Sequence, residues 1–307
     1  MRILISRLSS LGDVVCTLPA AGALKAGIPD AEIVWAVDAR FRGVVELCTN
    51  VDQIVDWPRR PRSWRKTASE LGEFDVALDL QGLLKSASVV ALVRAGRKLG
   101  YHWRREFAWI FTQAVKPDRT SLHVVDQYVD VARAAGGVAD EAVFGLVPNQ
   151  DDVAKVKAMV GDGRLVICNA GAGWASKRWP AKSFAQLANR LAADGATVAF
   201  IGAESDRAAF DEVRGHGCGA AIDLIGKTRV RELVALISLS KAHVGGDTGS
   251  SHIAAALGVP AISMYSVTRP ERTCPYGQRH RALYDPRGLA HIDVDSVHDA
   301  VTAAISG

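Results

Sequence analysis

Residues 242–265 read AHVGGDTGSSHIAAALGVPAISMY, which is a short apolar run, a glycine-rich turn, a helical stretch and a second apolar run. The runs at 242–245 and 261–265 have the length and bounding glycines of buried strands, and the helix is predicted at 253–257. Apolar strands that alternate with helices are typical of parallel sheets covered on both faces. This stretch therefore predicts an α/β fold.

The same alternation extends outward through most of the chain. We expect helices at 183–193 and 230–237, where apolar residues recur at helical spacing, and further strands at 2–6, 33–37, 75–79, 165–169 and 197–201. Because 307 residues exceed what one core usually organises, two domains are expected. A composition break at 145–152 puts the boundary between 1–148 and 149–307. The prediction is two Rossmann-like, doubly wound parallel-sheet domains that face a cleft, with ligands outside the carboxyl ends of the strands.

Composition narrows the class of protein. Hydrophobic residues make up 49% and charged residues 23%, as in soluble globular enzymes, and a net charge of +4 is too small to favour nucleic acid as a partner. No signal peptide or membrane-spanning run is evident, so we expect a cytoplasmic protein, with peripheral contact at the inner face of the inner membrane left open. Five scattered cysteines predict free thiols: Cys16, Cys48, Cys168, Cys218 and Cys274.

The first strand leads into SSLGD, residues 9–13, with a helix expected from about residue 14. A carboxylate in the first turn of a helix is stabilised in its charged form, so Asp13 is either a capping residue or a general base. Its position at a strand-to-helix turn favours the base. Pro19 is expected to kink the helix or to mark a new start.

Two further stretches are candidates for binding an acceptor. Lys85, in DLQGLLKS at 79–86, is either a solvated lysine or an acceptor contact just past a strand end. The segment PRRPRSWRK at 58–66 holds five cations and is either a solvated loop or a mobile site that captures carboxylates and phosphates. Arg60 and Arg62 are its proposed contacts, and its prolines are expected to prevent a regular helix.

The turn at 245–252, GGDTGSSH, is the strongest local signal for an anion. Backbone amides at the helix start and the Thr248 hydroxyl form a cradle suited to a diphosphate, unless the turn is merely structural. His252, one turn into the helix, is either a buried helix histidine or a phosphate contact. In NAGAGWASKRWP, residues 169–180, the glycines allow close approach of a ligand and Lys177 can neutralise a diphosphate.

Three other motifs are rejected. The G-x-G at 171–173 lacks the third glycine of a nicotinamide site, and Gly226-Lys227-Thr228 lacks the glycine that a P-loop needs five residues earlier. The D-x-D at 293–295 resembles a metal-binding triplet, but a helix capped by Asp295 explains it better. We therefore expect neither a metal nor another cofactor.

Taken together, these motifs resemble glycosyltransferase family 9, the heptosyltransferases of lipopolysaccharide core assembly. SSLGD, DLQGLLKS, KRWP at 177–180, DTGSSH at 247–252 and RPERTCPYG at 269–277 fall in the family's order. The front half is more like heptosyltransferase I, and the KRWP region is closer to heptosyltransferase II. The resemblance implies a GT-B fold and an inverting, metal-independent transfer of heptose from ADP-heptose to the Kdo–lipid A acceptor. It further implies that the donor binds mainly to the C-terminal domain and the acceptor to the N-terminal one.

Carried over by position, the resemblance makes Asp13 the base and Lys177 the neutralising lysine. Asp206, with Glu204 as the alternative, matches a ribose-binding carboxylate, and Thr228 matches a nucleoside contact. Ala172 and Gly173 replace two threonines near the phosphates, so the exact donor and the subtype stay open. The proposed donor-binding residues are Gly173, Asp206, Thr228, Asp247, Thr248, Gly249 and His252.

Alternative functions remain at this point. One is the same fold with a different sugar nucleotide or core acceptor. Others are a nucleotide-sugar epimerase, which needs a second acid/base pair, and a non-catalytic nucleotide-sugar binder. It also stays open whether the last helix packs back on the N-terminal domain.

Overall fold

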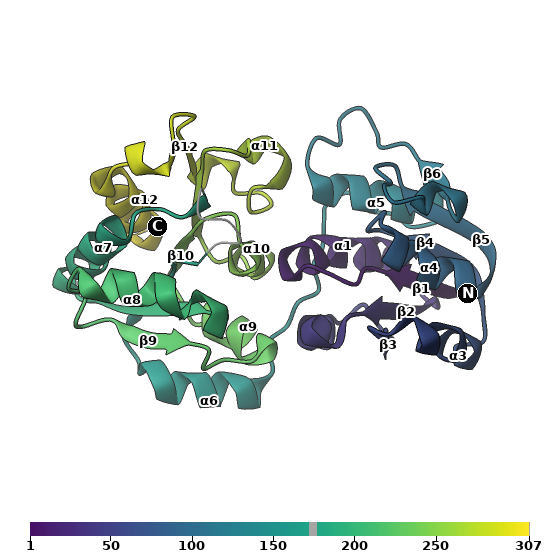
Figure 1. The fold of residues 1–307 in the computed structure, drawn as a ribbon, viewed down its shortest axis with the longest axis horizontal. Coiled ribbons are helices and arrows are strands. Elements are labelled where there is room, and N and C mark those ends of the chain that lie inside the picture. The colour runs from purple at the N-terminus through teal and green to yellow at the C-terminus, as the bar shows by residue number, and fades with distance from the viewer. Residues whose placement is uncertain (172–176, 307) are drawn as a thin grey trace. The chain divides into compact units, whose positions relative to one another are not determined.

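A computed structural model describes residues 1–171 and 177–306, which form two compact units, Met1–Val147 and Pro148–Gly307. Each unit holds one six-stranded parallel sheet with helices along both of its faces (Figure 1). The predicted fold class, two doubly wound α/β units, is confirmed. All seven strands expected from sequence are present to within two residues at either end.

The sheet of the first unit has the strand order β3-β2-β1-β4-β5-β6. Its strands are β1 (Arg2–Ser6), β2 (Glu32–Val37), β3 (Gln53–Asp56), β4 (Glu73–Asp79), β5 (Arg94–Tyr101) and β6 (Gln113–Val115). Its helices are α1 (Leu11–Gly27), α2 (Arg42–Val45), α3 (Trp64–Glu70), α4 (Leu84–Leu92) and α5 (Val124–Ala134).

Alternation along the central strands divides this core into two layers. Leu4 and Ala77 point to the face where α3 and α4 pack, and they share a cluster there with Phe74 and Val89. Helices α1 and α5 pack against each other in a second layer. Since β1 and β4 lie at the centre of the sheet and are buried on both faces, their carboxyl ends are held in fixed positions.

The second unit repeats this topology with the order β12-β11-β10-β7-β8-β9. Its strands are β7 (Arg164–Asn169), β8 (Ala196–Gly202), β9 (Ile222–Ile225), β10 (Ala242–Gly245), β11 (Ala261–Tyr265) and β12 (Ala282–Tyr284). Its helices are α6 (Gln150–Val160), α7 (Ala181–Ala193), α8 (Arg207–Gly215), α9 (Val230–Ser238), α10 (Gly249–Ala256), α11 (Pro270–Thr273) and α12 (Val294–Ser306). Helix α12 packs against α7, β10 and β11.

Three expectations about helix ends need correction. Helix α1 begins at Leu11 rather than near residue 14, and it passes through Pro19 without a break. Helix α12 is capped by Asp293, not Asp295, because the Asp293 carboxylate accepts hydrogen bonds from the backbone and hydroxyl of Ser296 at 2.7 and 2.9 Å. Asp295 instead forms an ion pair with Arg190.

Candidate active site

The first unit has a topological switch point between β1 and β4. Strand order runs outward from there in both directions, and Ser6 pairs in register with Asp79 where the two strands end. The loops that leave these ends turn to opposite faces of the sheet, which opens a crevice in folds of this kind. The motifs SSLGD and DLQGLLKS are these two loops.

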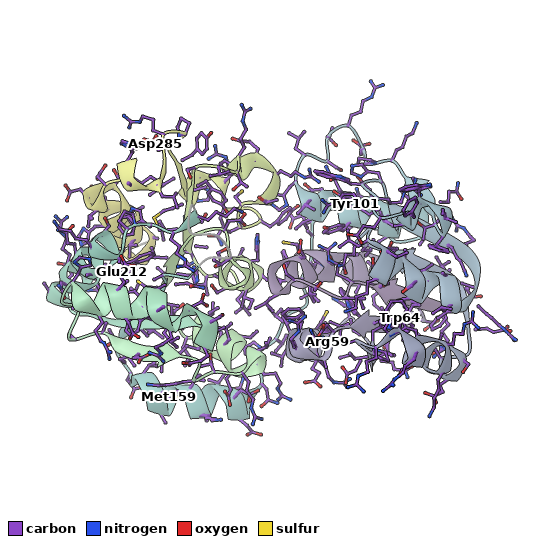
Figure 2. All side chains as sticks on the ribbon, viewed as in Figure 1. Arg59, Trp64, Tyr101, Met159, Glu212 and Asp285 are labelled. Carbon is purple, nitrogen blue, oxygen red and sulfur yellow. The ribbon has the colours of Figure 1, made fainter. Side chains whose placement is uncertain are left out.

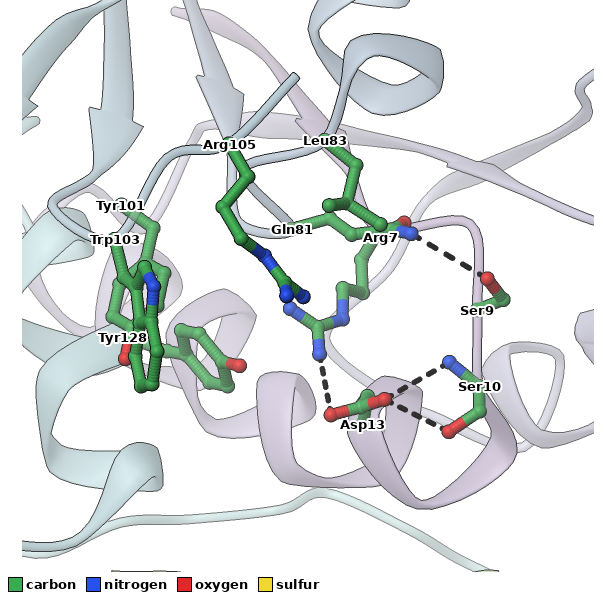
Figure 3. A pocket seen from close by; sticks show the side chains of 10 residues that line it. All are labelled: Arg7, Ser9, Ser10, Asp13, Gln81, Leu83, Tyr101, Trp103, Arg105 and Tyr128. Atoms are coloured by element: carbon green, nitrogen blue, oxygen red, sulfur yellow. Dashed lines mark hydrogen bonds and ion pairs between the residues drawn. The ribbon is translucent and has the colours of Figure 1, made fainter. Parts of the chain in front are cut away.

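A pocket of about 280 Å³ lies at this point (Figure 3). It is lined by Arg7, Ser9, Ser10, Asp13, Gln81, Leu83, Tyr101, Trp103, Arg105 and Tyr128.

Asp13 is the pocket's carboxylate, and three groups fix its orientation. The backbone N–H and the hydroxyl of Ser10 donate to Oδ2 at 3.1 and 2.8 Å, and the Arg7 guanidinium lies 2.7 Å from Oδ1 (Figure 3). Its place in the first turn of α1 adds the favourable field of the helix dipole. Asp13 therefore does cap the helix, yet its side chain is 49% exposed, so a ligand can reach the carboxylate.

Arg7 supplies a buried positive charge beneath Asp13. The guanidinium is 4% exposed, stacks on the Tyr128 ring at 4.9 Å and donates to the Leu80 carbonyl. Burial lowers the pKa of Arg7, but Tyr128 and Asp13 outweigh burial and the net shift is upward. Arg7 is thus charged at every physiological pH. No sequence pattern singled out Arg7, although Arg7 directly follows the first strand, where site residues are expected.

The other side of the pocket is aromatic and cationic. Tyr101, Trp103 and Tyr128 lie together in Figure 3, and the Arg105 side chain extends toward Arg7. Gln81 joins the two loops, because its Oε1 accepts the Leu8 N–H at 2.9 Å and its amide reaches the Ser9 hydroxyl at 3.4 Å. No sequence pattern singled out the aromatic residues, since they come from β5, the following loop and α5.

Lys85 is not among the residues that line this pocket. Its amine lies 3.7 Å from Asp38, a buried carboxylate at the end of β2 that Arg40 also binds through two side-chain hydrogen bonds. Those bonds, with Arg40 as the main cause, lower the pKa of Asp38 to about 2. The geometry supports a structural ion pair for Lys85 more than an acceptor contact.

The basic segment is more ordered than the sequence suggested. Pro61–Ser63 forms a 3-10 turn, and α3 begins directly after it at Trp64, so the expectation of no regular helix is wrong. Proline suits the first turn of a helix because its missing N–H would be unpaired there anyway. The Trp64 side chain, labelled in Figure 2, also anchors the segment, because its indole N–H donates to the Pro58 carbonyl at 2.7 Å. Arg60 and Arg62 are exposed and lie outside the Asp13 pocket.

The second unit has the equivalent switch point between β7 and β10, where Asn169 pairs in register with Gly245. The turn after β10 leads into α10, which begins at Gly249, four residues before the expected start. Thr248 is the residue that precedes the helix, and its backbone is extended. The first amides of a helix have no partner within the helix, so the anion cradle at this helix start stays a prediction.

A buried network supports this turn from below. The Ser250 hydroxyl lies 3.0 Å from the Thr248 hydroxyl, accepts from the Asn169 amide at 2.9 Å and contacts His243 Nε2 at 2.9 Å. Burial, followed by repulsion from His252, lowers the pKa of His243 to about 3, so this histidine is neutral. Asn169 begins the NAGAGWASKRWP motif, but no sequence pattern singles out His243 or Ser250.

Lys177, Asp247 and His252 come together beside the cradle. Lys177 Nζ lies 3.2 Å from one Asp247 oxygen, and His252 Nε2 lies 3.6 Å from the other. Burial alone would raise the pKa of Asp247, but His252 and Lys177 hold it below its usual value. Asp247 thus places two cationic or protonatable groups at the start of α10.

Asp206 lies next to the same sheet edge. A Cβ built on Gly171 would come within 2.5 Å of the Asp206 carboxylate, so that position has no room for a larger residue. Asp206 is itself fixed by the Ala203 N–H at 2.9 Å. Thr228 follows β9, two strands away from β7, and is half-buried. Gly173, with Ala172, lies outside the described residues.

Three properties of the described residues complete the account. The five cysteines are free and buried. Within 1–171 and 177–306, no three His, Cys, Asp or Glu side chains are grouped as metal ligands. Over the same residues no helix is both long and apolar enough to cross a membrane.

Comparison with known proteins identifies the family. The model of glycosyltransferase family 9 (heptosyltransferase) matches residues 64–294. Lipopolysaccharide heptosyltransferase 1 of Salmonella typhimurium is 28% identical, over 97% of this chain and 98% of that protein. Two solved structures share the fold: a family 9 glycosyl transferase from Veillonella parvula (TM-score 0.87, 20% identity, 99% and 97% coverage) and the ADP-heptose LPS heptosyltransferase II of Escherichia coli (TM-score 0.85, 23% identity, 100% and 99% coverage). With two Rossmann-like units of the GT-B type and a family match over most of its length, this chain belongs to glycosyltransferase family 9 and is a glycosyltransferase.

Proposed function

We propose that this enzyme transfers heptose from ADP-heptose to a hydroxyl of the lipopolysaccharide inner core, with Kdo–lipid A as the acceptor and inversion at the anomeric carbon. The names of the relatives support the reaction class, because they are heptosyltransferases of lipopolysaccharide assembly. The acceptor would bind in the unit that holds Asp13, and the donor in the unit that holds the anion cradle. We expect the enzyme to act in the cytoplasm.

The proposed donor site rests on the match between the negative charge of the diphosphate and positive groups at the start of α10. A diphosphate carries negative charge that suits the amides at the start of α10 and the Thr248 hydroxyl. The Lys177 amine would turn from Asp247 towards the β-phosphate, while Asp247 keeps its contact with His252. Asp206, which follows β8, would accept hydrogen bonds from the ribose, and Thr228 would contact the nucleoside.

The chemical step would be a single displacement. Asp13 takes the proton of the acceptor hydroxyl as that oxygen attacks the anomeric carbon on the face opposite the diphosphate. A general base must be ionised and within reach of the hydroxyl, and Asp13 has an exposed carboxylate held by Arg7 and Ser10. Charge grows on the leaving ADP, so Lys177 and the α10 amides would stabilise the transition state more than the ground state.

The observation that carries the proposal is an oriented, accessible carboxylate, Asp13, at the switch point of the first unit. The test is purified enzyme with ADP-heptose and Kdo–lipid A, with the mass and anomeric configuration of the product determined. We expect one added heptose in the configuration opposite to that of the donor.

Other results would point to the alternatives. Turnover only with another sugar nucleotide or a longer core acceptor would replace the proposed substrates and keep the chemistry. Conversion of the donor sugar in the absence of acceptor would indicate an epimerase. Donor binding without turnover of any acceptor would indicate a binding protein, and Asp13→Asn would then have no effect.

A further inference from the structure

The connection that follows β5 carries an aromatic patch, which we define as Trp103, Phe107, Trp109 and Ile110. Each of these side chains is at least half exposed, and all four occur within eight residues. Isolated apolar residues on a surface are ordinary, but a contiguous group of large ones marks an interaction site. The Phe107 and Trp109 rings lie 5.0 Å apart, so they form one surface.

This outward arrangement is fixed by the backbone. Glu106 and Phe107 have φ angles of 54° and 63°, a left-handed conformation that is rare for residues with side chains and persists only where the surroundings enforce it. The enforcing contacts are the Glu106 carboxylate, which accepts the Leu84 N–H at 3.3 Å, and the Arg105 N–H, which donates to Gly82 at 2.8 Å. Ala108 is fully buried between its exposed neighbours.

The connection that carries the patch also carries cations. Arg105, Lys116 and Arg119 are exposed on the same β5–α5 connection, and Arg104 lies within the patch segment. The acids of this connection up to Arg119 are Glu106, whose carboxylate accepts the Leu84 N–H, and Asp118, whose carboxylate accepts the Thr120 hydroxyl. The backbone N–H of Asp118 donates to the Asp130 carboxylate. Exposed tryptophan and phenylalanine beside arginine and lysine are typical of surfaces that sit at the interface of an anionic bilayer.

The position of the patch fits an acceptor that is anchored in a membrane. Trp103 and Arg105 also line the Asp13 pocket, so the patch borders the proposed acceptor site. A glycolipid whose acyl chains stay in the bilayer would have to present its sugar hydroxyl at this edge.

We propose that the aromatic patch is a membrane-docking surface. Its side chains insert at the headgroup level of an anionic bilayer, and Arg105, Lys116 and Arg119 bind lipid phosphates. The part of this inference that concerns acceptor delivery rests on the proposed function, whereas bilayer binding does not.

The test compares the wild-type protein with the variant Phe107→Ser/Trp109→Ser/Ile110→Ser, which spares the pocket residue Trp103. Sedimentation with vesicles of phosphatidylcholine and phosphatidylglycerol, without either substrate, measures binding. Because burial of each large apolar side chain is worth about a tenfold change in affinity or more, the variant should lose at least about 10-fold in binding. The control Val267→Ser removes an equally exposed apolar residue from the second unit and should bind as the wild type does.

Three outcomes would overturn the proposal: no sedimentation of the wild type, equal sedimentation of the triple variant, or equal binding to pure phosphatidylcholine. A wild-type dimer that dissociates in the triple variant would assign the patch to self-association instead. Thermal melts confirm folding of each variant. In the transferase assay, the triple variant should raise KM for acceptor in vesicles and leave kcat with a deacylated, water-soluble acceptor unchanged, so a failed transferase assay leaves the vesicle result standing.

Discussion

At the scale of single residues, the site depends on paired opposite charges. Asp13 is open to a ligand, while Arg7 beneath it is almost fully covered and stays charged. In the second unit Lys177 and His252 are paired with Asp247, and all three side chains are mostly buried. All of these residues except Arg7 are predicted from motifs, because reactive residues occupy strand-to-helix turns. Arg7 and its partner Tyr128 are harder to find, since Tyr128 reaches the pocket from α5, far along the chain from Arg7.

The first prediction concerns the base. Asp13→Asn keeps the size of the side chain but cannot accept a proton, so kcat should fall by at least about 10²-fold, which is typical of a lost general base. Donor affinity, measured by calorimetry with ADP, should change little, because the anion cradle lies in the other unit. Asp13→Ala should lose at least as much. Near-normal turnover in either variant would remove Asp13 from the chemistry.

The second prediction concerns Arg7. A buried cation favours the charged form of a neighbouring carboxylate, so Arg7→Met should move the acid limb of the kcat pH profile to higher pH. Arg105 and Tyr128 also face the pocket and remain in this variant. Arg7→Lys keeps the charge and should restore most of the limb. A loss of kcat that is equal at every pH would mean that Arg7 acts through packing alone.

At the scale of elements, the buried strands are predictable from sequence, whereas strands that are partly exposed or very short are not. Strands such as β1, β7 and β10 are buried over all or nearly all of their length, and their predicted ends agree with the structure to within one residue. Strand β5 was missed because its sequence, RAGRKLGY, is largely exposed over its first half, and only its last three residues are buried. Strands β6 and β12 have three residues each, too few for a periodic signal. The helix of the basic segment is hard to predict because proline disrupts the interior of a helix, whereas Pro61 lies just before the start of α3.

The third prediction belongs to that basic segment. Arg60 and Arg62 are exposed beside an ordered turn, so they are available to an acceptor that carries carboxylates and phosphates. Arg60→Ala/Arg62→Ala should raise KM for acceptor about two- to tenfold, with the difference shrinking at high ionic strength because exposed charges are screened. KM for donor should stay the same. Arg214→Ala, which removes an exposed arginine from α8 of the second unit, is the control. Equal changes for both substrates would exclude the segment from the acceptor site.

At the scale of the whole molecule, one topology is used twice. Both sheets have the same strand order, and both carry their polar residues where the order reverses. The first unit places a carboxylate there, and the second places amides, hydroxyls and a lysine. Alternation of strands and helices was enough to predict this architecture. It was not enough to predict side chains such as His243, whose role depends on contacts between residues that are neighbours only in the folded sheet.

The last prediction follows from this distribution of charge. A glycosyltransferase must neutralise the diphosphate that leaves, either with a divalent metal or with its own cations and dipoles. In the function that we propose, Lys177 and the start of α10 serve that purpose. The D-x-D at 293–295 is engaged elsewhere, with Asp293 on Ser296 and Asp295 on Arg190. Turnover should therefore persist in EDTA, while Lys177→Met should lose about 10²-fold or more in kcat, in line with the loss of one transition-state contact. Activity that EDTA abolishes and Mg²⁺ or Mn²⁺ restores would assign the neutralising role to a metal.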